Sequence, residues 1–137
     1  MNRLKKIGFI SVGNWYISDS GIKYKLASHH SVKNVLYSFI SNGDIKYIGK
    51  TRRQLYQRMN GYQNPGSSQT TNIRINKLLN DLIKQEQPID IFILIDNGLL
   101  KFGDFKINLA AGLEDTLIYE LNPNWNLVGK NSVSIEK

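Results

Sequence analysis

Four sets of side chains in this sequence could carry out chemistry: a pair of tyrosines, an arginine, a glutamate and an asparagine. Tyr37 and Tyr47 lie in two neighbouring apolar runs, Arg58 follows them, and Glu114 and Asn126 lie towards the C-terminal end. Glu114 borders the apolar stripe of a predicted helix, and a buried carboxylate there needs an arginine or a metal ion as partner. The others also have structural explanations, as core rings, a surface arginine and a loop amide that satisfies backbone groups.

The two tyrosines belong to a predicted β-hairpin. Two mostly apolar segments, at 36–40 and 45–48, are interrupted only by Ser38 and Lys46, and Asn42-Gly43 lies between them. Asn-Gly is a strong hairpin signal because both residues tolerate the positive φ that a tight primed turn requires. Pairing around this turn would bring Tyr37 and Tyr47 near each other on adjacent strands. The rest of the chain is expected to cover this hairpin or to bring side chains to it.

A helix that carries the arginine is predicted directly after the hairpin. Thr51 is a suitable N-cap and Gly61 a suitable residue just past the C-terminal end. Arg58 and Tyr62 are four residues apart, so they share a face only if the helical turn continues through Gly61.

Further elements follow from hydrophobic periodicity. Two more helices have an apolar stripe at helical spacing, and a nearly continuous apolar, β-branched run between them is typical of a buried strand. The predicted elements are a helix at 72–86 capped by Thr70 or Thr71 and stopped by Pro88, a strand at 89–95, and a helix at 109–121 capped by Asn108.

The element order predicts an α+β fold: a small, mostly antiparallel three-stranded sheet flanked by helices, with an N-terminal β extension. Residues 7–27 alternate apolar and polar positions around Gly/Asn/Asp turns, which indicates two or three short strands in that extension. The expected organisation is an extension at 1–34, the main domain at 35–128 and a polar tail at 129–137.

Charge is distributed unevenly along the chain. The protein has 137 residues, a formal net charge of +7 and a pI of about 9.6. The first 86 residues carry a net +10 and the last 51 carry −3. This asymmetry is typical of a protein that binds a polyanion, with nucleic acid as the first candidate, although a basic protein without such a partner is the alternative.

Composition excludes several classes of protein. The chain contains no cysteine, so disulfides, thiolate metal sites and a cysteine nucleophile are excluded. No apolar run has membrane-spanning length, and no signal peptide follows the basic start. We therefore expect a cytoplasmic protein without membrane contact.

The candidate residues together resemble the GIY-YIG nuclease superfamily. Val35-Leu36-Tyr37 followed by Tyr47-Ile48-Gly49 is similar to its paired signature, with Val35-Leu36 in place of Gly-Ile. Each motif alone is weak, but the ordered set is specific and spans residues 35–126. The matching positions are Arg58 for the family arginine, Tyr62 where the family has His or Tyr, Glu114 for the metal-binding glutamate and Asn126 for the asparagine after it.

The resemblance implies a DNA endonuclease that hydrolyses phosphodiester bonds with Mg²⁺ or Mn²⁺ held by Glu114. Arg58 would offset phosphate charge, and a tyrosine, with Tyr37 favoured over Tyr47, would act as general base. Tyr62 would hydrogen-bond the phosphate or the base, and Asn126 would hold the region of the glutamate. A tyrosine base needs nearby positive charge because its ordinary pKa is about 10.

A narrower resemblance is to the small type II restriction endonucleases of this superfamily, which cut double-stranded DNA at a defined sequence. A palindromic site would favour a homodimer. The alternatives are a structure-specific repair or recombination nuclease and a non-catalytic DNA-binding module on the same fold. The candidate DNA-binding residues are Lys50, Arg52, Arg53, Gln69, Asn72 and Arg74. The last three are of the types that read base edges, with helix capping and surface solvation as their slightly favoured alternative.

Overall fold

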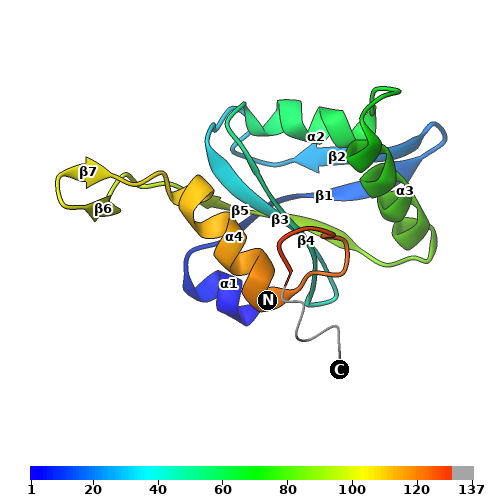
Figure 1. Cartoon of the computed structure of the whole chain (residues 1–137). Coiled ribbons are helices and arrows are strands. Elements are labelled where there is room, and N and C mark those ends of the chain that lie inside the picture. The colour runs from blue at the N-terminus through cyan, green and yellow to red at the C-terminus, as the bar shows by residue number, and fades with distance from the viewer. Residues whose placement is uncertain (131–137) are drawn as a thin grey trace.

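A five-stranded antiparallel sheet forms the centre of the molecule, in the strand order β2-β1-β5-β3-β4 (Figure 1). The computed structural model describes residues 1–130, so the predicted tail at 129–137 lies almost entirely outside the described residues. The strands are β1 at Ile10–Ser18, β2 at Gly21–Leu26, β3 at Val35–Ser41, β4 at Asp44–Thr51 and β5 at Ile89–Ile95.

The predicted hairpin is confirmed as β3 and β4. Asn42 and Gly43 connect the two strands with φ values of 51° and 82°, so both adopt the left-handed conformation that a primed turn requires. In the pairing, Tyr37 lies opposite Gly49 and Phe39 lies opposite Tyr47. The rings of Tyr37 and Tyr47 are therefore diagonal neighbours, with their centroids 6.4 Å apart.

The prediction of three strands is wrong, because the N-terminal strands extend the same sheet. β1 pairs with β5 from Ile10 opposite Ile93 to Trp15 opposite Ile89. β5 thereby has β3 along one side and β1 along the other, and β2 follows at the far edge. The strand signals of residues 7–27 were local, whereas pairing partners so distant in sequence are chosen by tertiary packing.

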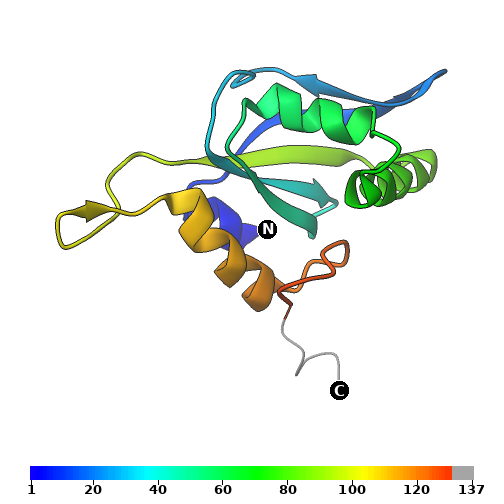
Figure 2. The same ribbon diagram turned by 45° about the horizontal axis from the view of Figure 1, so that its top comes forward.

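Helices cover both faces of the sheet (Figures 1 and 2). On one face lie α2, Leu55–Gln63, and α3, Thr70–Lys84, and on the other lie α1, Asn2–Lys6, and α4, Leu109–Leu121. All seven residues of β3 are buried as a result. Tyr37 belongs to the core under α2 and α3, whereas its neighbour Leu36 belongs to the core under α1 and α4.

The helix α2 begins and ends later than the predicted caps, Thr51 and Gly61, indicated. Thr51 is the last residue of β4, and α2 begins at Leu55, with Gln54 and Gln57 forming a capping box. The Thr51 hydroxyl instead accepts a hydrogen bond from the Arg53 amide at 3.1 Å, which turns the chain out of the strand. Because α2 continues through Gly61 to its last residue, Arg58 and Tyr62 share a face.

The other predicted helices agree better. α3 begins two residues before the predicted start, after Gln69 as N-cap rather than Thr70 or Thr71, and ends at Lys84. α4 has the predicted bounds, and its N-cap Asn108 accepts a hydrogen bond from the Ala111 amide at 3.2 Å. The short helix α1 was not predicted.

A separate two-stranded ribbon, β6 at Lys101–Phe102 and β7 at Phe105–Lys106, projects from the body between β5 and α4 (Figure 1). Among residues 1–130, no helix has the length and apolarity needed to cross a membrane.

Candidate active site

A cluster of two tyrosines and an arginine lies between the hairpin and α2. The hydroxyl oxygens of Tyr37 and Tyr62 are 2.6 Å apart and share a hydrogen bond. Arg58 donates from Nε to the Tyr37 oxygen at 3.0 Å and from Nη2 to the Tyr62 oxygen at 2.6 Å. The sequence-predicted residues Tyr37, Arg58 and Tyr62 are thus brought into direct contact.

Asn72, at the start of α3, holds the arginine from the other side. Its Oδ1 accepts a hydrogen bond from Arg58 Nη2 at 3.1 Å, and its Nδ2 donates to Gln69 Oε1 at 3.1 Å. Asn72 is buried, so in this arrangement it positions Arg58 and does not face solvent as a DNA-reading side chain would. The Arg58 guanidinium also lies over the Tyr62 ring, 4.0 Å from its centroid.

Both phenols of this cluster are held in their neutral form. Burial raises the pKa of Tyr37 to about 12, against the opposing effect of the Arg58 charge. Burial also raises the pKa of Tyr62 well above its ordinary value, and the neighbouring Tyr37 adds to this. The desolvation of the charged form outweighs the nearby arginine, so neither phenol loses its proton readily near neutral pH.

Gly49 is required by the position of the Tyr37 ring. A Cβ at Gly49 would lie 2.5 Å from both Cζ and Oη of Tyr37, inside any ordinary contact distance. Any larger residue would displace the ring that Arg58 binds. The glycine of the Tyr47-Ile48-Gly49 motif therefore has a steric reason that the sequence pattern alone did not reveal.

The C-terminal segment is attached to β4, which is the edge strand of the sheet. The Trp125 amide donates to the Lys46 carbonyl at 2.8 Å. The Asn126 side chain then accepts from the Ile48 amide at 3.0 Å and donates to the Ile48 carbonyl at 2.9 Å. Asn126 thus uses its amide as a neighbouring strand would use its backbone, which is the structural explanation considered for it.

A cavity of about 340 Å³ opens at this edge of the sheet, between α3 and α4. Tyr47 reaches it from the α2 and α3 face, and Glu114 reaches it from α4 on the opposite face. The Tyr47 ring also lies 6.1 Å from the Tyr62 ring, so it connects the cavity to the tyrosine–arginine cluster. The lining residues are Tyr47, Ile48, Thr71, Arg74, Glu114, Asp115, Ile118, Asn126, Leu127, Val128 and Gly129.

Glu114 is paired with a lysine in this structure, and its role as a metal ligand stays a prediction. Lys50 Nζ lies 3.4 Å from Glu114 Oε1, and the Glu114 side chain is only 16% exposed. Burial raises the pKa of the Glu114 carboxyl, and the Lys50 ammonium opposes this rise.

A divalent metal ion fits this carboxylate only as a partly hydrated ion with few protein ligands. Among residues 1–130, no three or more His, Cys, Asp or Glu residues are grouped as a metal cage. Mg²⁺ commonly binds through one or two carboxylates and keeps several waters. Glu114, with Asp115 beside it at a cavity that has room for waters, satisfies that requirement.

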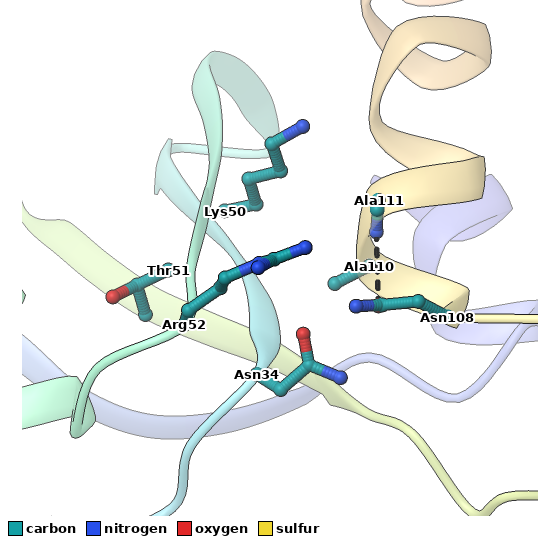
Figure 3. Close-up of a pocket in the computed structure, with 7 residues that line it drawn as sticks. All are labelled: Asn34, Lys50, Thr51, Arg52, Asn108, Ala110 and Ala111. Carbon is teal, nitrogen blue, oxygen red and sulfur yellow. Dashed lines mark hydrogen bonds between the residues drawn. The ribbon is translucent and has the colours of Figure 1, made fainter.

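The predicted DNA-binding residues occupy two places. Lys50 and Arg52 line a small hollow of about 50 Å³ beside the start of α4, and the Arg52 side chain points towards Asn108 and Ala110 (Figure 3). Gln69 and Arg74 lie on the other side, at the beginning of α3 and at the large cavity. Arg53 is exposed in the loop that follows β4.

Several cavity residues were not predicted. Thr71 precedes Arg74 by three residues on α3, so helical periodicity could have identified it once Arg74 was chosen. Asp115 adjoins Glu114 in sequence. Residues 127–129 carry no sequence signal, because only the attachment of the chain after α4 to β4 brings them to the cavity.

The fold matches that of the GIY-YIG nucleases, the family that the motifs resembled. No family model matches the sequence, and no curated protein matches it. Among solved structures, a mutant of bacteriophage T4 EndoII is similar with a TM-score of 0.73 and 23% identity, over 92% of this chain and 97% of that one. The restriction endonuclease Hpy188I in complex with product DNA is similar with a TM-score of 0.54 and 15% identity, over 95% of this chain and 83% of that one. Both are GIY-YIG nucleases.

Proposed function

We propose that this protein is a divalent-metal-dependent DNA endonuclease that hydrolyses phosphodiester bonds. The observation that carries the proposal is the meeting of Tyr47 and Glu114 at one cavity, near a half-buried Arg58 that donates hydrogen bonds to two tyrosine hydroxyls. A protein that only bound DNA would not need this combination. The endonuclease fold of the two similar structures supports the same activity.

The chemistry would divide among residues from both faces of the sheet. Glu114 would hold Mg²⁺ or Mn²⁺, which when bound offsets the charge that develops on phosphate and leaving oxygen. Arg74 lines the same cavity and would bind a phosphate oxygen. The positive charge of Arg58, which binds the hydroxyls of Tyr37 and Tyr62, would offset the negative charge of the phosphate. Tyr62 would donate a hydrogen bond to the phosphate.

We assign the water-activating role to Tyr47 rather than Tyr37. Tyr47 lines the cavity, whereas Tyr37 is buried in the arginine cluster with its pKa raised to about 12 by burial. Tyr37 would instead hold Arg58 and the neighbouring ring in place. Asn126 would fix the segment that closes the cavity after α4, through its two hydrogen bonds to Ile48.

Double-stranded DNA is the proposed substrate, and recognition of a defined sequence is the proposed specificity. The first 86 residues supply the net positive charge, including Lys50 and Arg52 at the small hollow and the exposed Arg53 after β4. Gln69 is exposed at the beginning of α3, close to Arg74, and these are side-chain types that read base edges. A type II restriction enzyme acting as a homodimer on a palindrome is the specific form of this proposal.

The deciding experiment incubates the protein with phage DNA and Mg²⁺. Discrete bands support a restriction enzyme, and a smear indicates non-specific cutting. Preference for branched or nicked DNA indicates a structure-specific nuclease. Intact DNA with every divalent ion, together with salt-sensitive binding, would leave only a DNA-binding module.

Two matched variants on α4 test the assignment of Glu114. Glu114→Gln should abolish cleavage and leave DNA binding largely intact, because the amide cannot replace a carboxylate as metal ligand. Glu120→Gln removes an exposed carboxylate of the same helix that does not line the 340 Å³ cavity, and it should cut like the wild type. Wild-type cleavage by Glu114→Gln would show that Glu114 is not the metal ligand.

A further inference from the structure

The carboxylate proposed to hold the metal already has a cation beside it. Lys50 Nζ lies 3.4 Å from Glu114 Oε1. Lys50 is at the end of β4 and Glu114 is on α4, and these two elements are in contact along the edge of the sheet. The pair therefore joins the two hollows, since Lys50 lines the small one and Glu114 the large one.

The two partners differ in their freedom to move. The Lys50 side chain is 46% exposed and the Glu114 side chain 16% exposed. Lys50 is flexible along its four-carbon stem, and Figure 3 shows its ammonium extending away from the Arg52 guanidinium. The lysine can therefore leave the carboxylate for solvent at small cost, whereas the carboxylate remains at the cavity.

A divalent ion and the ammonium compete for the same oxygens. A metal ion on Glu114 would lie within a few ångströms of Lys50 Nζ as it now stands, and two cations at such a distance repel each other strongly away from bulk water. Occupation of the carboxylate by one cation therefore requires the other to withdraw.

We propose that Lys50 is a built-in counter-ion that occupies Glu114 in the metal-free protein and is displaced by the divalent ion on binding. The inference rests on the proposed function, because it takes Glu114 as the metal ligand. The lysine keeps a half-buried carboxylate paired when no metal is bound, and it lowers the intrinsic affinity of the site for metal. The displaced ammonium would move to solvent on the side of the small hollow that Lys50 lines together with Arg52, where a phosphate of the substrate would meet two cations.

The test is a titration of the purified protein with Mn²⁺ in the absence of DNA. Electron paramagnetic resonance measures the free Mn²⁺ at each step and gives the Kd of the site. Lys50→Met should bind Mn²⁺ about fivefold more tightly than the wild type, as expected from removing a partly exposed ion pair. Lys50→Arg keeps a cation at the carboxylate and should stay close to the wild-type Kd.

A matched control separates this effect from a general change in charge. Lys77→Met removes a lysine whose Nζ lies 3.0 Å from Asp81 on the exposed face of α3, and it should leave the Mn²⁺ affinity unchanged. Circular dichroism of each variant verifies that it folds.

The outcomes distinguish failure of the inference from failure of the proposed function. If Glu114→Gln loses the Mn²⁺ site but Lys50→Met binds Mn²⁺ no more tightly than the wild type, the counter-ion role is overturned and the metal ligand stands. If Glu114→Gln binds Mn²⁺ as the wild type does, Glu114 is not the metal ligand. The proposed metal site and the counter-ion role of Lys50 are then both overturned.

Discussion

Replacement of Gly49 by alanine tests the geometry on which the tyrosine–arginine cluster depends. The added Cβ would lie 2.5 Å from Tyr37 Cζ and Oη and 2.9 Å from Cε1. Ordinary contacts between such atoms are about 3.5–4.0 Å, so the ring must move by roughly 1 Å. Tyr37 is only 1% exposed and its hydroxyl is bound to Tyr62 and Arg58, so the ring cannot move without displacing its neighbours or weakening these hydrogen bonds.

The expected cost follows from these contacts. Overpacking a core typically costs about 1–3 kcal/mol. Weakening one hydrogen bond to a charged group adds about 1.5–3 kcal/mol, and the lower entropy of the unfolded alanine chain returns about 0.4–1 kcal/mol. We therefore expect Gly49→Ala to lower the free energy of unfolding by about 3 kcal/mol, and to reduce cleavage further because the ring displaced is the one that holds Arg58.

Urea unfolding followed by circular dichroism measures the change, with the m-value compared between proteins. Gly112→Ala on the exposed side of α4 is the matched control. Its Cβ would meet only Ile107 Cγ2, at 3.4 Å, and alanine should stabilise the helix by about 0.8–1 kcal/mol. A second control is a double-mutant cycle with Tyr37→Leu, which removes the clashing atoms and should reduce the cost of the alanine. Stability of Gly49→Ala within about 0.5 kcal/mol of the wild type would refute the close contact.

Two further predictions concern charge at the site. Arg58→Lys should lower the single-turnover cleavage rate by on the order of 10²-fold, because Arg58 binds Tyr37 through Nε but Tyr62 and Asn72 through Nη2, and the single nitrogen of lysine cannot occupy both positions. An unchanged rate would contradict this role. Burial raises the folded-state pKa of Glu114 above its ordinary value, so the folded protein binds this proton more tightly than the unfolded chain does. Wild-type stability therefore falls as pH rises from the ordinary pKa through the raised one. The melting temperature of Glu114→Gln minus that of the wild type should therefore be higher at pH 7 than at pH 4. An equal difference at both pH values would contradict the raised pKa of Glu114.

Much of the site could be predicted from the sequence because its signals are local. Asn42-Gly43 accepts positive φ at two successive positions, so the turn and the pairing of the two strands follow from it. The pairing then shifts by one residue between Phe39 and Ile40, and this irregularity, which no local signal predicted, places Tyr47 on the same face as Tyr37. Asn108 caps α4 by the side-chain chemistry expected of that residue type. The helical spacing of Arg58 and Tyr62 likewise predicted a shared face, on the condition that the helix passed Gly61.

Other parts of the prediction failed where two local signals had equal merit. Thr51 is a good N-cap by type, but the strand before it continues through this residue, and the hydroxyl is used in the turn that follows. Asn72 shows a similar ambiguity: it has the type of a DNA-reading side chain, and α3 packs against α2 so that its amide binds Arg58 in this structure, while its contact with DNA stays a prediction. A residue type suggests several roles, and packing selects among them.

The sequence by itself determined the chemical inventory: the tyrosines, the arginine, the glutamate and the positive charge of the first 86 residues. Only the tertiary structure decided on which face of the sheet each of these groups lies. Alternate residues of a strand point to opposite faces, so Tyr47 and Lys50 of the same strand lie on opposite sides of the sheet. Tyr47 nevertheless meets Glu114, the ion-pair partner of Lys50, because β4 is the edge strand and the cavity there is lined from both faces. Strand order depends on pairing between segments distant in sequence, for which no local pattern carries the information.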